Sequence, residues 1–319
     1  MSEGFRKLHR QTQGDFFATH HGQHSGFGGS AYRVQPDQFD RNLAPGIRDK
    51  APAYFAEKGI AWHQHANHGL SSQVCCLNFL MPLAQTPELL ARLVGRALGI
   101  EPPEMLPMEQ DLSGDDWFVA FEWIGLQDYL NEASKNGSRT RGANATSADA
   151  AVRFRIDGRT EIALIEWKFT ESYGSPIPPA GNATRSDRYR DLAFAPVGPI
   201  RPDLELVLED FYWEPFYQML RQQMLAKRME AAQELGAQRV RVIHISPSGN
   251  HDLHKVTAPA MRRFGDDAFM VFRSLLAEPD AFVGWSIEDL FGPYARTGNS
   301  VWADYLRLRY PLLCGSETS

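Results

Sequence analysis

Apolar side chains occupy every second position of residues 148–156, with more polar side chains between them. A spacing of two predicts a β-strand. Asp157-Gly158 follows directly, and this pair is typical of a two-residue hairpin turn. The next segment, residues 161–169, is apolar on both faces until Glu166 and Lys168, which predicts a central strand buried on both sides. These positions therefore predict a β-hairpin inside the protein.

Apolar residues at helical spacing flank this hairpin on both sides. A helix over residues 73–81 is expected after the capping residues Ser71 and Ser72. A second is expected over residues 86–99, where Thr-Pro-Glu opens the pattern and glycine ends it. A third is expected over residues 215–236, where apolar positions form one stripe.

The remaining segments complete a prediction of one α/β domain over residues 1–319, with a mixed central sheet flanked by helices. Further strands are expected at 117–124 and 239–246, and loops at 135–146 and 174–202. We divide the domain into an irregular N-terminal arm (1–70), a catalytic core (71–247) and a C-terminal extension of short helices and loops (248–319).

Composition and charge narrow the class of protein. The chain is 43% hydrophobic and 23% charged, and it contains no apolar run of the roughly 18 residues that a membrane span needs. Three cysteines and no signal-peptide pattern favour a reducing, cytoplasmic location. The net charge of −6 counts against binding nucleic acid through the overall field, but it does not exclude a local basic groove.

The hairpin also places candidate chemistry. If Asp157-Gly158 forms the turn, Asp149 lies directly opposite Glu166, with Cβ atoms about 5 Å apart, and Lys168 points to the same face. Two facing carboxylates on buried strands repel each other and lose hydration. A divalent cation removes this cost, and Mg²⁺ binds through one or two carboxylates together with substrate phosphate. Lys168 would add positive charge beside the metal-bound water.

These residues resemble the D…E-x-K signature of the PD-(D/E)XK nuclease superfamily, with Asp149 followed after the hairpin by Glu166-Trp167-Lys168. The expected order of helix, three strands, helix and strand resembles the restriction-endonuclease-like αβββαβ core, over residues 71–247. The segments SSQVCCLNFLMPL, TSADAA, LIEWKFTE and EPFYQMLRQQMLA look like a bacterial branch of this superfamily. Ala148 stands where the family pattern usually has proline.

The resemblance implies Mg²⁺-dependent phosphodiester hydrolysis, with Mn²⁺ as a substitute ion and nucleic acid as the partner. DNA is the expected substrate, cleaved by an endonuclease in defence or repair. Asp149 and Glu166 would be metal ligands and Lys168 the electrostatic catalyst. Glu122 would be a further acid and metal ligand, and Gln222 a site glutamine. Gln218 and Glu171 are weaker candidates, and the resemblance also allows a homodimer.

Other interpretations stay open for each feature. The charged residues could form a solvated face at strand ends, Glu122 could be an ordinary strand charge, and the glutamines could be surface residues. The function could also be that of a non-catalytic nucleic-acid- or protein-binding module on a nuclease-like fold. The histidines could belong to a zinc hydrolase or contact substrate phosphates, and the basic residues could contact a phosphate backbone. These groups are His63, His65 and His68, then Arg185, Arg188, Arg190, Lys227 and Arg228.

Overall fold

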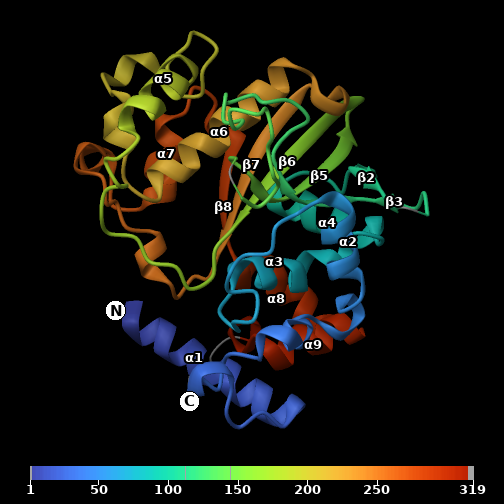
Figure 1. Cartoon of the computed structure of the whole chain (residues 1–319). Helices are drawn as coiled ribbons and strands as arrows, with labels where there is room; N and C mark the ends of the chain where they lie inside the picture. The colour runs from blue at the N-terminus through green and yellow to red at the C-terminus, as the bar shows by residue number, and fades with distance from the viewer. Residues whose placement is uncertain (1, 112, 144, 315–319) are drawn as a thin grey trace.

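A six-stranded mixed sheet lies between two layers of helices in the described part of the chain (Figure 1). The computed structural model describes residues 2–111, 113–143 and 145–314. Asn144 of the predicted 135–146 loop and both ends of the predicted domain therefore lie outside the described residues. The predicted α/β architecture, with a mixed central sheet flanked by helices, is confirmed.

The sheet is built around the predicted hairpin. Its strands run in the order β1-β5-β6-β7-β8, and β4 also pairs with β5. Their bounds are β1 Glu104–Leu106, β4 Val119–Trp123, β5 Ala148–Ile156, β6 Arg159–Trp167, β7 Arg239–Ser246 and β8 Phe282–Ser286. Pairing is antiparallel from β1 and β4 to β5 and from β5 to β6, and it is parallel from β6 through β7 to β8. A separate small ladder joins β2 (Glu109–Gln110) to β3 (Asp116–Trp117).

Most of the hairpin has the predicted register, but the ladder ends one position before the predicted pair Asp149–Glu166. Ile156 pairs with Arg159, and the ladder continues to the pair Ala150–Ile165. Asp157 and Gly158 both have positive φ, at 50° and 76°, as a tight turn between right-twisted strands requires. Because the register is continuous, the start of β5 and the end of β6 lie together at one end of the sheet.

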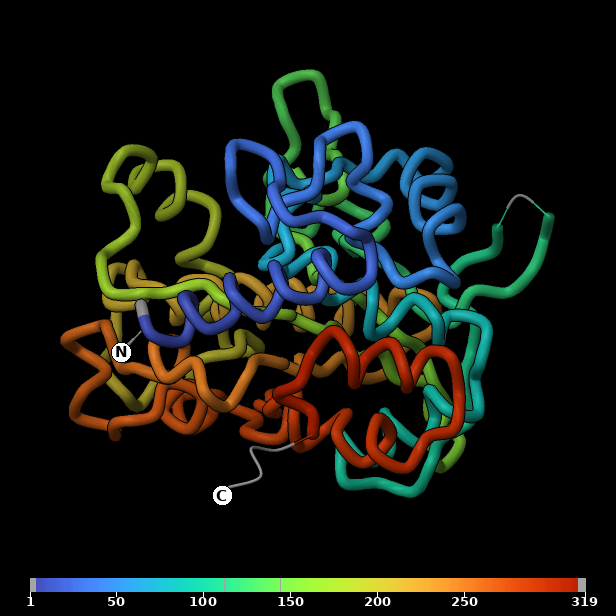
Figure 2. Tube along the Cα trace, turned by 90° about the horizontal axis from the view of Figure 1, so that it is seen from below, coloured from blue at the N-terminus to red at the C-terminus, as the bar shows by residue number. Residues whose placement is uncertain are grey.

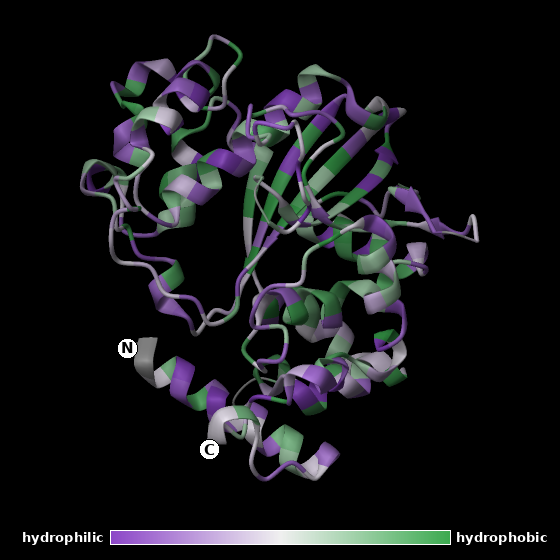
Figure 3. Cartoon of the chain, viewed as in Figure 1, coloured by the Kyte–Doolittle hydropathy of each residue, from purple (hydrophilic) through white to green (hydrophobic). Residues whose placement is uncertain are grey.

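Helices cover both faces of this sheet, and each face has its own hydrophobic cluster. One layer consists of α1 (Ser2–His21), α2 (Lys50–Lys58), α3 (Ser72–Leu80), α4 (Pro87–Leu98), α8 (Ile287–Thr297) and α9 (Val301–Arg309). The other consists of α5 (Asn182–Ala193), α6 (Phe216–Ala231) and α7 (Ala268–Leu275). Along β6, Ile165 and Trp167 pack into the first layer and Leu164 into the second. Figure 3 shows apolar residues along the central strands and on α3.

Most predicted elements in residues 71–247 are present. Helix α3 begins after Ser71, whose side chain accepts a hydrogen bond from the nitrogen of Val74 (3.3 Å). Helix α4 ends at Gly99 in a left-handed conformation, as expected of a C-terminal glycine. The third helix is shorter than predicted, because α6 ends at Ala231. The strand expected at 117–124 is divided into β3 and β4.

Three segments differ from the predictions. The arm over residues 1–70 is not irregular, since it contains α1, α2 and several 3₁₀ turns. The expected loop at 174–202 contains α5, which buries only Tyr189 and Ala193 and so shows no apolar period. The C-terminal extension supplies β8 as well as helices. Helix α5 and strand β8 bury few apolar side chains, so their sequences show only a weak period. None of the described helices is both long enough and apolar enough to cross a membrane.

Candidate active site

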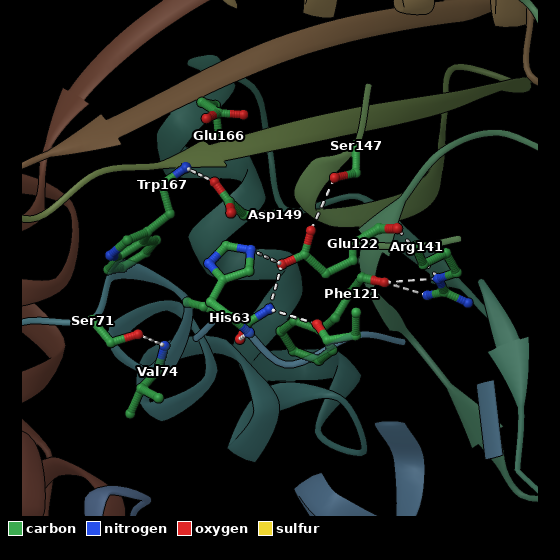
Figure 4. A network of polar contacts seen from close by, with 12 residues as sticks. His63, Ser71, Val74, Phe121, Glu122, Arg141, Ser147, Asp149, Glu166 and Trp167 are labelled. Atoms are coloured by element: carbon green, nitrogen blue, oxygen red, sulfur yellow. Dashed lines mark hydrogen bonds and ion pairs between the residues drawn. The ribbon is translucent and has the colours of Figure 1, made fainter. Parts of the chain in front are cut away.

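The candidate residues gather where β4 and β6 end and β5 begins, between α3 on one side and α6 on the other. Figure 4 shows part of this cluster, including Glu122, Asp149 and Glu166. Glu122 and Glu166 are each only 3% exposed, while Asp149 is partly accessible. Acidic side chains are seldom buried without a partner, so their contacts decide what the cluster can do.

Glu166 is held by two donors that the sequence analysis had singled out. The Nζ of Lys168 donates to Glu166 Oε1 at 2.5 Å. The Nε2 of Gln222, on α6, donates to Glu166 Oε2 at 2.8 Å and to the carbonyl oxygen of Ser147 at 2.5 Å. Gln222 is therefore a buried residue that joins β6 to the segment before β5, rather than a surface residue of α6.

Asp149 makes a different contact. Its Oδ2 accepts a hydrogen bond from the backbone nitrogen of Trp167 at 2.6 Å. Figure 4 shows the Asp149 side chain turned toward this nitrogen, with Glu166 drawn on the other side of the β6 ribbon in that view. Asp149 thus lies at the end of β6, but it is bound to the backbone there and is not paired with Glu166 on one face of the sheet as predicted.

Glu122 lies at the centre of a third set of contacts. Gln73 Nε2 donates to its Oε1 (2.7 Å), and Ser147 Oγ donates to its Oε2 (2.9 Å). His63 Nε2 lies 3.5 Å from the same Oε1. The backbone of Glu122 has φ of 49°, a left-handed conformation that is costly for a residue other than glycine. Such strained positions concentrate at functional sites.

The loop before β5 holds this strained segment in place. Arg141 Nε donates to the carbonyl oxygens of Phe121 (3.0 Å) and Glu122 (3.3 Å). Arg141 is itself paired with Glu109 at 2.6 Å. At Gly142 a Cβ atom would lie 2.8 Å from the Ala61 carbonyl oxygen, so only glycine fits without displacing a neighbour.

Burial is the main influence on the charges of this cluster. It raises the pKa of Glu166 to about 8 and that of Glu122 to about 7, and it raises the pKa of Asp149 as well. The ammonium of Lys168 opposes this rise, whereas neighbouring carboxylates add to it. For Lys168 burial disfavours the charge, but Glu166 and other acidic neighbours raise the pKa well above its usual value. One lysine therefore faces three carboxylates.

This imbalance fits a bound divalent cation. Three carboxylates supply the hard oxygen donors that Mg²⁺ prefers, and a cation would favour their ionised forms. The buried Gln222 Oε1, next to Glu166, has no hydrogen-bond partner among the described residues. Among these same residues, however, no group of three or more His, Cys, Asp and Glu side chains is already arranged around one metal position. Metal binding at this cluster stays a prediction, and a Mg²⁺ ion there would take water and phosphate oxygens as further ligands.

Several other residues were also placed by the structure. His63 and Gln73, which contact Glu122, were not predicted to belong to this cluster; the crowded segment WHQHANHGL was the only signal for His63. Gln218 instead accepts a hydrogen bond from Tyr173 (3.3 Å), and Glu171 accepts one from the nitrogen of Phe169 (2.7 Å).

The candidate basic residues are engaged elsewhere. Arg185 donates to the carbonyl oxygens of Pro178 and Ala180 at the start of α5, and Arg190 pairs with Glu209 at 3.2 Å. Lys227 pairs with Glu230 and Glu278. These contacts favour structural roles for the three residues.

Comparison with protein families agrees with this geometry. The family model described as "Restriction Endonuclease associating with ARP" matches residues 6–311. Comparisons with curated proteins and with solved structures found no match. The matched region includes all three candidate carboxylates, Lys168 and Gln222, and it extends over nearly the whole chain. The chain therefore belongs to this restriction-endonuclease-like family.

Proposed function

We propose that the protein is a Mg²⁺-dependent nuclease that hydrolyses phosphodiester bonds in DNA, as an endonuclease in defence or repair. The observation that carries the proposal is the surplus of buried carboxylate at one end of the sheet, beside a lysine that keeps its charge. A purely structural cluster has no need for this surplus, since buried charge without compensation destabilises a fold. The family supports the same reaction class.

Asp149, Glu166 and Glu122 are the residues that would hold the metal. A Mg²⁺ ion, when bound, supplies a charge that lowers the pKa of water and stabilises negative charge on phosphate. Lys168 holds its proton beside Glu166, where it would stabilise the negative charge that develops on a bound phosphate during hydrolysis. Gln222 keeps Glu166 oriented. Homodimer formation and a cytoplasmic location stay predictions.

The test is cleavage of plasmid and short duplex DNA with Mg²⁺ or Mn²⁺, with RNA of the same sequence assayed in parallel. We expect Asp149→Asn and Glu166→Gln to abolish cleavage, because each replacement keeps the shape and removes the charge. Glu104→Gln is the matched control, since Glu104 is exposed and pairs only with Arg155 on β5. Undiminished cleavage by both site variants would refute the assignment.

A further inference from the structure

A cavity of about 470 Å³ opens beside the candidate active site. Its lining includes Arg6 and Arg10 of α1, His65 and His68, and Glu171 after β6. His63 also lines it, and the Nε2 of His63 lies 3.5 Å from Glu122 Oε1. His63 therefore contacts both the cavity and the carboxylate cluster.

Both arginines come from α1, which lies outside the predicted catalytic core. Figure 2 shows this helix crossing the underside of the molecule as the blue coil. Arg6 and Arg10 are one turn apart and so share a face of the helix. Arg6 donates to the Thr170 carbonyl oxygen (3.0 and 3.2 Å), and Arg10 lies over the Tyr32 ring at 5.7 Å. Among the described residues neither arginine pairs with a carboxylate.

Helix α1 is fixed in place by contacts of neighbouring residues along its length. The His9 ring packs between the rings of Phe5 and Phe169, with centroids 4.3 and 5.0 Å away. Further along the helix, Gln13 donates to the carbonyl oxygen of Arg309 (3.0 Å) and accepts from Arg309 Nε (2.9 Å). The two arginines are thus presented by a helix that is already docked, which lowers the entropy cost of binding an anion.

The charges in the cavity favour an anion. Burial is the largest cause that lowers the pKa of His68, to about 4, and the positive charges of Arg33, Arg10 and Arg6 lower it further. The one carboxylate of the lining, Glu171, already accepts a hydrogen bond from the nitrogen of Phe169. Arg6 and Arg10 thus place positive charge in this cavity, next to the candidate active site, although the chain as a whole has a net charge of −6.

We propose that this cavity binds a backbone phosphate of the nucleic acid, close to the phosphate that is cleaved, with Arg6 and Arg10 as its cationic ligands. Guanidinium groups match the geometry of phosphate oxygens, and phosphate contacts fix the position of a nucleic acid without reading its sequence. The proposal rests on the proposed nuclease function. It adds a substrate-positioning role for α1, a helix that lies outside the D…E-x-K motif.

The test measures binding of a fluorescent DNA duplex by anisotropy, in EDTA so that no cleavage occurs, at several salt concentrations. Arg10→Ala should weaken binding about tenfold, since hydrogen bonds to charged groups are among the stronger ones. It should also lower the slope of log affinity against log salt by about one, as expected for one lost phosphate contact. Lys7→Ala is the matched control, because Lys7 is an exposed cation of the same helix that does not line the cavity.

Two further variants keep the outcome clear. Arg6→Ala should act in the same direction, and Arg10→Lys should restore part of the affinity, with thermal unfolding confirming that each variant is folded. If Arg10→Ala matches the wild type, or if Lys7→Ala loses as much affinity, the phosphate site is refuted. Cleavage that depends on Asp149 would still uphold the nuclease function in that case. A wild type that neither binds nor cleaves DNA would refute both.

Discussion

Two clusters of charge are buried in this protein, and they are compensated in different ways. Arg309, at the end of α9, is fully buried, and oxygens of Asn42, Tyr305 and Gln13 surround its guanidinium. At the carboxylate cluster, Glu122 and Glu166 are almost as deeply buried, yet burial raises both pKa values. Arg309 has the hydrogen bonds that it needs, whereas the carboxylates lack positive charge.

This difference suggests a structural role for the Arg309 cluster and a chemical role for the carboxylate cluster. A buried cation whose three nitrogens all donate hydrogen bonds joins segments that are far apart in sequence, here α1, the 3₁₀ turn at Asn42 and α9. A buried group of anions with one lysine stores an unfavourable energy that a ligand can relieve. The predictions below test whether the first cluster serves stability and the second serves catalysis.

The largest effect is expected at Arg309. Arg309→Met should lower the free energy of unfolding by about 3–5 kcal/mol, because it leaves several buried oxygens without donors. Chemical denaturation would measure this loss. Arg262→Met, at an exposed position, should change stability by less than about 0.5 kcal/mol. Equal stability of the two variants would contradict the structural role of Arg309.

Lys168→Met should act on cleavage. We expect kcat/KM to fall about 10²- to 10³-fold, or about 3–4 kcal/mol, as when one charge-stabilising donor is removed from an active site. Initial rates on a short duplex with Mg²⁺ measure the effect. Lys135→Met, at an exposed loop position, is the control and should cleave at the wild-type rate. Cleavage by Lys168→Met at that same rate would contradict a catalytic role.

Gln222→Ala should have a smaller effect on the same reaction. Removal of the amide that orients Glu166 should reduce activity or metal affinity about 10- to 100-fold. Gln218→Ala is well matched, since Gln218 lies one turn earlier on α6 and contacts Tyr173 instead. A dependence of KM on Mg²⁺ that is changed in Gln222→Ala alone would support the positioning role. Identical kinetics of the two variants would argue against it.

The smallest effect concerns pH and metal together. The folded-state pKa values of about 8 for Glu166 and about 7 for Glu122 exceed the usual 4.5. Between pH 4.5 and these folded-state pKa values, the two carboxyl groups keep protons in the folded protein that they have lost in the unfolded chain. The free energy of unfolding should therefore fall as pH rises through this range. Mg²⁺ favours the ionised carboxylates, and at tenfold its Kd it should restore about 1.4 kcal/mol.

Thermal unfolding in EDTA and in Mg²⁺, at about pH 5 and about pH 8.5, would measure this coupling. Stabilisation by Mg²⁺ should be greater at the higher pH and should be absent in Glu166→Gln. An equal shift at both pH values, or an unchanged shift in the variant, would show that the ion binds elsewhere.

The sequence predicted the central hairpin well because two local signals agreed there. Asp157-Gly158 fixed the turn, and the apolar alternation fixed which residues face each other. The spacing of two also placed Lys168 beside Glu166, but the predicted pairing of Asp149 with Glu166 was not found, because the ladder ends at Ala150–Ile165 and Asp149 binds the Trp167 nitrogen instead. Gln222 was expected only from the resemblance to the PD-(D/E)XK superfamily.

Contacts between distant segments could not be predicted in this way. His63 and Gln73 reach Glu122 from a loop and a helix N-terminus, and neither position has a periodic pattern. Helix α1 is mostly polar, and one of its anchors is a buried arginine about 300 residues away in sequence. The left-handed backbone at Glu122 also has no signal in a strand pattern.

The docked position of α1 has a practical consequence for dividing this protein. A fragment trimmed to residues 71–247 would keep the D…E-x-K motif but discard β8, which pairs with β7 at the sheet edge, together with α8 and α9 beneath it. A shorter deletion of residues 1–21 would strip Gln13 from Arg309 and Arg6 from Thr170. Such fragments would expose apolar surface that the full chain buries. Loss of activity in a fragment would therefore reflect misfolding and would say nothing about the catalytic residues.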